Sequence, residues 1–171
     1  MNQGENCSCG SRLIVHRSVH EELVERLAAG LRDWPVGDPM DPSTRIGPMI
    51  EQPHLDKVLG YIDRGRAEGA RIVTGGTRIL ESSGGWFVAP TIFDGVTNSM
   101  SIARDEIFGP VLSVVRVPTY EDAVRLVNDN PYGNGTAIFT RDGGAARQFE
   151  DRKSTRLNSS HIQKSRMPSS A

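Results

Sequence analysis

Short runs of β-branched residues alternate with helical repeats along most of this chain, and this alternation most limits the folds that it can adopt. The strongest strand pattern is VLSVVRV at 111–117, which lies between Pro110 and Pro118. Weaker strand patterns lie at 12–16, 71–74, 91–93 and 136–139. Helical spacing of apolar residues is found at 18–33, at 53–69 and from 119 or 120 onward. We therefore predict an α/β fold with a largely parallel sheet flanked by helices.

Local signals mark where two of these helices should begin. Ser18 is followed three residues later by Glu21, which is the pattern of a capping box. Pro53 suits the first turn of the next helix, because the backbone N–H that proline lacks would have no helical partner there. His16 and His20 have a spacing that can bind a metal on a helix, but here they span a strand end and a helix start. We expect both to be surface imidazoles rather than metal ligands.

Charge and hydropathy exclude several classes of partner. The chain has a net charge of −1, and because 151–171 contains five basic residues and one acid, 1–150 is acidic. This acidity argues against a nucleic-acid partner. No stretch approaches the ~20 apolar residues of a membrane span, and the N-terminus lacks the pattern of a signal peptide. With Cys7 and Cys9 as its only cysteines, placed too close for an unstrained mutual disulfide, the chain is expected to be cytoplasmic.

Cys7 is the candidate reactive residue. It lies among small and polar residues just before a predicted strand, whereas a structural cysteine usually lies in an apolar run. Gly4 and Gly10 leave open backbone on either side, so that a substrate could approach. From these residues alone, a nucleophilic thiol and an ordinary unreactive cysteine both remain open.

Four segments resemble, in the right order, motifs of the aldehyde dehydrogenase superfamily. They are the cysteine segment NQGENCSCGSR at 2–12, GWFVAPTIF at 85–93, DEIFGPV at 105–111 and NPYG at 130–133. The last departs from the family pattern because Asn134 stands where leucine is usual. The resemblance covers residues 1 to about 150, which we interpret as part of the catalytic domain of a longer enzyme. It implies that the cofactor domain, the general base and an asparagine of the oxyanion site lie outside this chain.

The resemblance also implies a reaction and three site residues. Cys7 would be the nucleophile that converts an aldehyde to a carboxylic acid through a thiohemiacetal and a thioester. Glu106 would hold the nicotinamide ribose hydroxyls of NAD or NADP, and Phe108 would pack beside that ribose. The parent enzyme would be a homo-oligomer acting on a small aldehyde, without a metal. Without the resemblance, Glu106 reads as a solvated acid and Phe108 as a core aromatic.

The subtype signals conflict. The cysteine segment resembles bacterial enzymes that oxidise amino- or γ-glutamylamino-aldehydes. The stretch 130–149 resembles methylmalonate-semialdehyde dehydrogenase, which transfers its acyl group to coenzyme A. An intermediate subfamily, a chimeric sequence and an inactive, non-enzymatic relative of this fold are the alternatives.

The last residues form a different region. From 151 to 171 the sequence has neither helical nor strand periodicity, which predicts a disordered tail. DRKSTRLNSSH and SRMPSSA within it resemble, in one reading frame, the translation of a DNA sequencing-library adapter. We therefore expect 151–171 to be an assembly artefact, and Met1 to be an internal methionine or a start assigned to truncated DNA.

Overall fold

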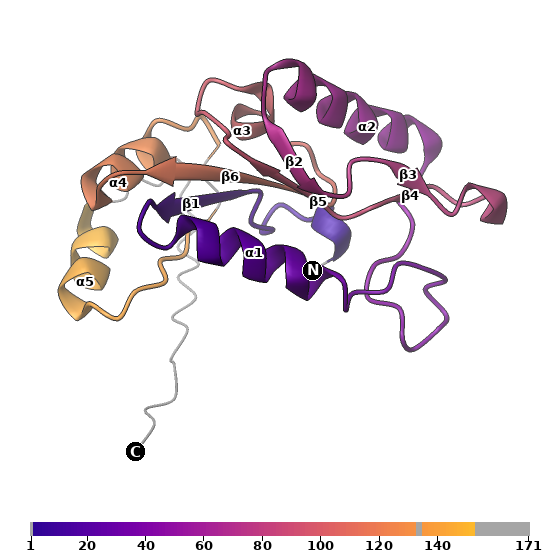
Figure 1. Cartoon of the computed structure of the whole chain (residues 1–171), viewed down its shortest axis with the longest axis horizontal. Helices are drawn as coiled ribbons and strands as arrows, with labels where there is room; N and C mark the ends of the chain where they lie inside the picture. Colours follow the sequence, from indigo (N-terminus) through magenta and orange to yellow (C-terminus); the bar gives the residue numbers. More distant parts are fainter. Residues whose placement is uncertain (1, 133–134, 153–171) are drawn as a thin grey trace.

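A central four-stranded sheet organises the computed structural model, which describes residues 2–132 and 135–152 (Figure 1). The strands are β1 (Arg12–His16), β2 (Arg71–Thr74), β3 (Arg78–Ile79), β4 (Phe87–Val88), β5 (Thr91–Asp94) and β6 (Val111–Val117). The α-helices are α1 (His20–Leu31), α2 (Gln52–Ala67), α3 (Ser101–Arg104), α4 (Tyr120–Asn128) and α5 (Gly143–Arg152). Single 3-10 turns are η1 (Asn2–Gly4) and η2 (Glu81–Ser83).

Three of the four strands of this sheet run parallel. Their order is β1-β6-β5-β2, in which β6 pairs in parallel with both β1 and β5, and β2 is antiparallel to β5 at the edge. Separately, β3 and β4 form a small antiparallel hairpin. The predicted α/β fold with a largely parallel sheet flanked by helices is thus confirmed.

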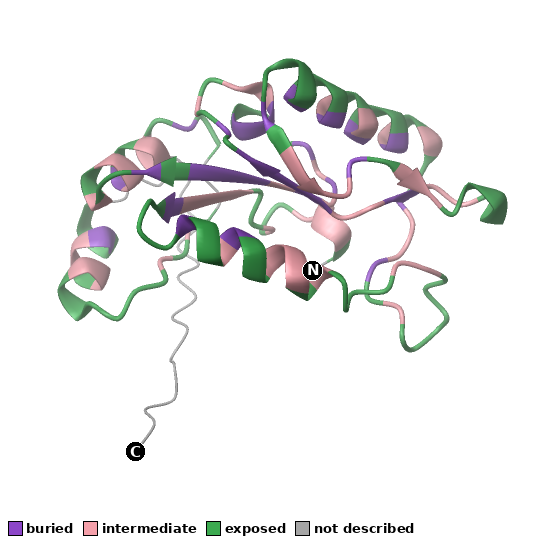
Figure 2. Ribbon diagram, viewed as in Figure 1, coloured by how far each residue is buried: buried purple, intermediate pink, exposed green. Residues whose placement is uncertain are grey.

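Helices cover both faces of the sheet. Figure 1 shows α2 and α3 on one face and α1 on the other. Alternate side chains of the central strands supply the two cores: Phe93 and Val115 pack with α2 and α3, whereas Ile92 and Val114 pack with α1. Figure 2 shows this burial on β6 and on the inward faces of α1 and α2. Each such buried side chain stabilises the fold by about 1.5–3 kcal/mol, so the two layers hold the sheet in place.

The structure corrects three local predictions. Residues 135–140 have no regular structure, so the strand predicted at 136–139 is wrong; Phe139 is exposed, and no described strand pairs with this run. The capping box of Ser18 does not form, because its hydroxyl bonds to His16 Nδ1 at 2.7 Å and α1 has no side-chain cap. His20 is buried, not a surface imidazole, whereas His16 is exposed as expected.

Other expectations of the sequence are met. The strands at 12–16, 71–74, 91–93 and 111–117 are present, and Pro53 lies in the first turn of α2. Thr119 caps α4 by accepting a hydrogen bond from the Asp122 backbone N–H at 3.1 Å.

Helix α5 continues to Arg152, so it includes the first two residues of the tail predicted at 151–171. Residues 153–171 lie outside the described residues.

Candidate active site

Cys7 lies in an exposed turn between η1 and β1. The Asn6 side chain shapes this turn: its Oδ1 accepts hydrogen bonds from the Ser8 backbone N–H at 2.9 Å and from the Ser8 hydroxyl at 2.7 Å. The Asn6 carbonyl accepts a third hydrogen bond, from the Cys9 backbone N–H at 3.0 Å. Cys9 is half-buried. The turn therefore presents Cys7 toward solvent more than it does the second thiol.

Arg12 anchors the far end of the cysteine segment, where β1 begins. Its guanidinium donates a hydrogen bond to Asn98 Oδ1 at 2.9 Å, and burial lowers the pKa of Arg12 from its ordinary value. The Ser11 carbonyl accepts a hydrogen bond from the Ser113 backbone N–H at 3.0 Å, which joins the segment to β6.

Glu106 and Phe108 lie on the segment that joins α3 to β6. Glu106 is exposed, and its backbone carbonyl is 3.4 Å from the Lys57 ammonium. Phe108 is half-buried and has φ of 63°, in the left-handed region that costs a non-glycine residue about 1–3 kcal/mol. Beside them, burial and then a hydrogen bond to Asp105 raise the pKa of Tyr61. The segment thus exposes a carboxylate while its backbone is held in a strained conformation.

The cysteine segment and the 105–110 segment are in direct contact. A Cβ built on Gly4 would lie 2.1 Å from the Gly109 carbonyl oxygen, so the two backbones approach too closely for any side chain at Gly4. Gly4 also has φ of +86°, which other residues rarely adopt. The sequence-predicted residues Cys7, Glu106 and Phe108 therefore lie on two segments that the fold brings together.

Parallel pairing explains this meeting. The cysteine segment precedes β1 and the 105–110 segment precedes β6, and these two strands are parallel neighbours. Segments that precede parallel neighbouring strands emerge at the same edge of a sheet. The candidate site is thus at the amino ends of these strands, whereas ligands of open α/β sheets usually bind outside the carboxyl ends.

Two further side chains join the segments and were missed from the sequence. His54, in the first turn of α2, has Nε2 2.5 Å from the Phe108 carbonyl oxygen and 3.3 Å from Glu5 Oε1. Glu5 in turn accepts a hydrogen bond from the Gln3 side chain at 2.9 Å. No local motif distinguishes His54, since its partners are distant in sequence and only the packing of α2 brings them close.

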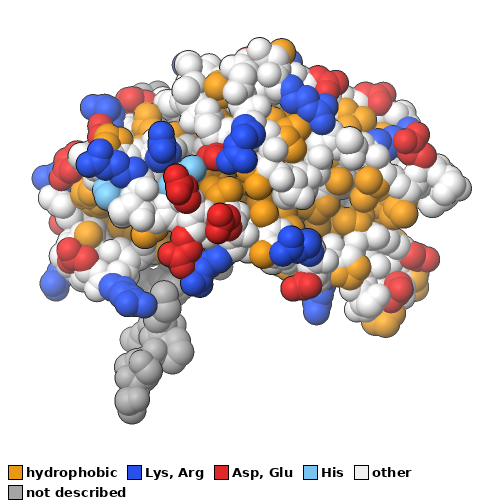
Figure 3. Space-filling model, viewed as in Figure 1, with side chains coloured by type: hydrophobic (Ala, Val, Ile, Leu, Met, Phe, Trp, Pro, Cys, Tyr) orange, Lys and Arg blue, Asp and Glu red, His pale blue; other side chains and the backbone are white. Residues whose placement is uncertain are grey.

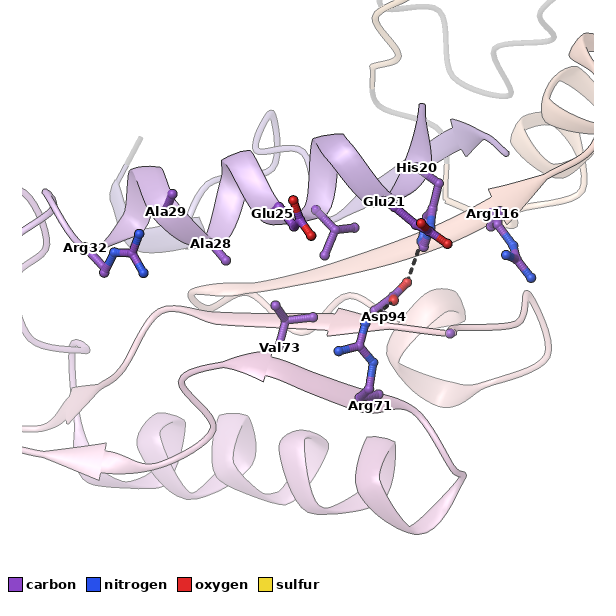
Figure 4. A pocket seen from close by; sticks show the side chains of 12 residues that line it. His20, Glu21, Glu25, Ala28, Ala29, Arg32, Arg71, Val73, Asp94 and Arg116 are labelled. Atoms are coloured by element: carbon purple, nitrogen blue, oxygen red, sulfur yellow. Dashed lines mark hydrogen bonds and ion pairs between the residues drawn. The ribbon is translucent and has the colours of Figure 1, made fainter. Parts of the chain in front are cut away.

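A second polar cluster lies at the opposite edge of the sheet. His20 begins α1 and Asp94 ends β5. With Arg71 they line an open hollow of about 800 Å³ beneath α1 (Figure 4). Burial, the largest single influence, raises the pKa of Asp94, but hydrogen bonds from Arg71, the Gly95 backbone and His20 together keep it below its ordinary value. The cluster is thus a charge-stabilised junction between α1, β2 and β5, remote from the cysteine turn.

Comparison with known proteins identifies the family. The family model described as "Aldehyde dehydrogenase family" matches residues 1–164. The chain belongs to the aldehyde dehydrogenase family. The matched range includes Cys7, Glu106 and Phe108, so the family resemblance of the motifs around them is confirmed.

Individual relatives agree with the family match. The chain is 42% identical over 149 residues to malonate-semialdehyde dehydrogenase 1 of Geobacillus thermodenitrificans, covering 86% of this chain and 31% of that protein. It is 44% identical over 139 residues to aminoacetaldehyde dehydrogenase of Pseudomonas aeruginosa, covering 81% of this chain and 27% of that protein. The chain thus spans about a third or less of the curated relatives that it matches.

Solved structures show the same fold. The aldehyde dehydrogenase KauB of Pseudomonas aeruginosa is 46% identical and superimposes with a TM-score of 0.86, covering 88% of this chain and 31% of KauB. Other matching aldehyde dehydrogenase structures were determined with bound NAD⁺. No described helix of this chain is long and apolar enough to cross a membrane.

Proposed function

We propose that the protein containing this chain is an NAD-dependent aldehyde dehydrogenase that uses Cys7 as its nucleophile. The observation that carries the proposal is the contact between the cysteine segment and the 105–110 segment, in which Gly4 meets Gly109. This contact holds the exposed Cys7 thiol and the Glu106 carboxylate on adjoining backbone. It is an arrangement suited to a reaction between a thiol-bound substrate and a second bound molecule.

The proposed chemistry at Cys7 follows from the properties of a thiolate. The thiolate adds to the aldehyde carbon, and the carbonyl electron pair moves onto oxygen to form a thiohemiacetal alkoxide. Collapse of this alkoxide expels hydride from the same carbon and leaves a thioester on Cys7. Water then attacks the thioester and releases the carboxylic acid and the free thiol. NAD, when bound, supplies the acceptor for the hydride.

The residues of the 105–110 segment fit a ribose and nicotinamide. The exposed Glu106 carboxylate is an acceptor for the two hydroxyls of a ribose, and the half-buried Phe108 offers an apolar face beside it. We propose these two residues as the cofactor contacts of this chain. Relatives with bound NAD⁺ support NAD as the cofactor. A lower KM for NADP than for NAD would contradict this choice.

For the substrate, we propose an amino- or γ-glutamylamino-aldehyde. The cysteine segment supports this choice because it surrounds the reacting atom, and a relative of the chain is an aminoacetaldehyde dehydrogenase. The second candidate is a semialdehyde whose acyl group passes to coenzyme A. It is supported by the sequence of 130–149 and by a relative named malonate-semialdehyde dehydrogenase. We further propose a cytoplasmic homo-oligomer.

A chimera tests the function in a full-length protein. The part of KauB that matches this chain, 31% of KauB, is replaced by the matching residues of this chain. We expect NAD-dependent oxidation of 3-aminopropionaldehyde, and the loss of nearly all turnover in C7S but not in C9S. Equal activity of C7S and the unsubstituted chimera would contradict the assignment of Cys7.

Two further measurements test the finer proposals. E106Q removes the charged acceptor, so we expect a higher KM for NAD with little change in KM for the aldehyde. Adding coenzyme A to the reaction distinguishes the two substrate classes: an acyl-CoA product from malonate semialdehyde would favour the second. An unchanged KM for NAD in E106Q would exclude Glu106 as a cofactor contact.

A further inference from the structure

His54 joins both halves of the candidate site. Its Nε2 lies 2.5 Å from the Phe108 carbonyl oxygen and 3.3 Å from Glu5 Oε1, and the His54 and Glu5 side chains are only 15% and 10% exposed. Both neighbours are pure acceptors, so Nε2 must carry a proton and donate to them. A single N–H therefore connects the cysteine segment to the 105–110 segment.

The geometry also shows which of the two contacts dominates. The carbonyl contact is short, whereas the carboxylate contact at 3.3 Å is at the long end for a hydrogen bond. The His54 ring meets the Phe108 ring edge-on, with centroids 6.3 Å apart and planes at 73°, which is a favourable aromatic arrangement. His54 thus contacts Phe108 through both its backbone and its side chain.

The contact with His54 restrains the backbone of Phe108, which is strained. Phe108 is held at φ of 63°, and such a conformation persists only where its surroundings over-determine it. Its neighbours Ile107 and Gly109 are buried, which fixes the backbone on either side. The His54 N–H then fixes the direction of the Phe108 carbonyl, and with it the plane of the Phe108–Gly109 peptide. This peptide ends at the Gly109 Cα, whose own carbonyl group lies against Gly4.

From these contacts we propose that His54 is a positioning residue for hydride transfer. It acts through Phe108 and Glu5 and sets the separation of the thiol-bearing turn from the segment that carries Glu106. The inference rests on the proposed function, because it assumes that Cys7 and Glu106 hold the two reacting molecules. Removing the N–H should let the segments shift, which lowers the rate of the step that depends on their separation.

The decisive comparison is between H54L and H54Q in the full-length chimera with KauB. Leucine retains apolar contact with the Phe108 ring but has no donor, whereas the glutamine amide can donate to the Phe108 carbonyl. We expect H54L to lower kcat by about tenfold to a hundredfold, since small displacements of reacting groups have effects of that size. We expect H54Q to have a kcat close to that of the unsubstituted chimera.

An isotope effect separates positioning from a general loss of structure. With the aldehyde deuterated at its carbonyl carbon, H54L should show a larger isotope effect on kcat than the unsubstituted chimera, because hydride transfer becomes slower relative to the other steps. H16L is the matched control, since His16 is an exposed histidine at the opposite edge of the sheet. We expect H16L to leave both kcat and the isotope effect unchanged.

The alternatives have distinct outcomes. Equal kcat for H54L, H54Q and the unsubstituted chimera would overturn the positioning role, as would failure of both variants to fold, which would make His54 a stability residue only. If C7S and E106Q also retain full activity, the proposed function itself fails. If those two lose activity while H54L does not, only the inference about His54 fails.

Discussion

His20 Nε2 lies 2.6 Å from Asp94 Oδ1, which ties the first turn of α1 to the end of β5. Arg71 donates to the other carboxylate oxygen at 2.6 Å, and both His20 and Asp94 are buried. Because a buried carboxylate needs such partners, this junction should contribute to stability in a pH-dependent way.

The D94N variant tests that contribution. The pKa of Asp94 is lowered in the folded state, so its stabilisation is present above the unfolded value of ~3.9 and is lost as the pH falls below it. We expect D94N to lower the free energy of unfolding by about 1–3 kcal/mol at neutral pH. The difference in free energy of unfolding between D94N and the unsubstituted chimera, measured by urea unfolding, should become smaller below about pH 4. D63N is the control: it removes an exposed partner of Arg66 and should change stability little at any pH. A loss of unfolding free energy in D94N that is the same at all pH values would contradict the prediction.

Gly4 should tolerate no side chain. A Cβ there would lie 2.1 Å from the Gly109 carbonyl and would force an alanine to φ of +86°. We expect G4A to destabilise the chimera by more than about 1 kcal/mol and to lower kcat, because the two segments must separate. G30A is the control: Gly30 lies inside α1 with open space around it, so alanine should stabilise by about 0.5–1 kcal/mol. Thermal unfolding and kcat measure both effects, and a G4A chimera as stable as its parent would refute this prediction.

The helix caps give a matched pair of serine and threonine substitutions. Thr119 accepts the Asp122 N–H at 3.1 Å at the start of α4, whereas α1 has no side-chain cap and Ser18 bonds to His16 instead. We therefore expect T119A to cost about 1 kcal/mol of unfolding free energy and S18A to cost about half of that or less. Denaturant midpoints of the two chimeras compare these losses directly. Equal losses of unfolding free energy in T119A and S18A would mean that the Thr119 cap does not stabilise α4.

The isolated 171-residue chain should lack dehydrogenase turnover and should self-associate. Large apolar side chains that remain exposed include Trp34, Met40, Ile50 and Phe139, and Figure 3 shows apolar side chains gathered over part of one face. Such surface favours association when nothing covers it. Sedimentation and assays of cofactor reduction test this; a monomer that oxidises aldehydes with NAD would disprove it.

The origin of residues 151–171 is tested by the source DNA. If this stretch is translated adapter, independent reads across codon 150 should continue into coding sequence that does not encode residues 151–171. Reads that reproduce the codons of 151–171 from several libraries would establish the tail as genuine.

Local signals in the sequence predicted most of the secondary structure. The β-branched run at 111–117 and the apolar repeat of α1 specify their elements without reference to the rest of the chain, because strand and helix periods are local. The run at 136–139 has a similar pattern but does not form a strand, because a strand also needs a neighbour and no described strand pairs with this run. The prediction that His20 is exposed is wrong for a related reason: its buried partner Asp94 is distant in sequence.

By itself, then, the sequence determined the α/β class, the order of the elements and the motifs that identify the family around Cys7 and Glu106. Only the tertiary structure decided that these two segments meet, because β1 and β6 pair in parallel and their preceding segments share one edge. It alone placed Gly4 against Gly109 and His54 between Glu5 and Phe108. The physical reason is that such contacts depend on how strands and helices pack, which no local pattern of residues encodes.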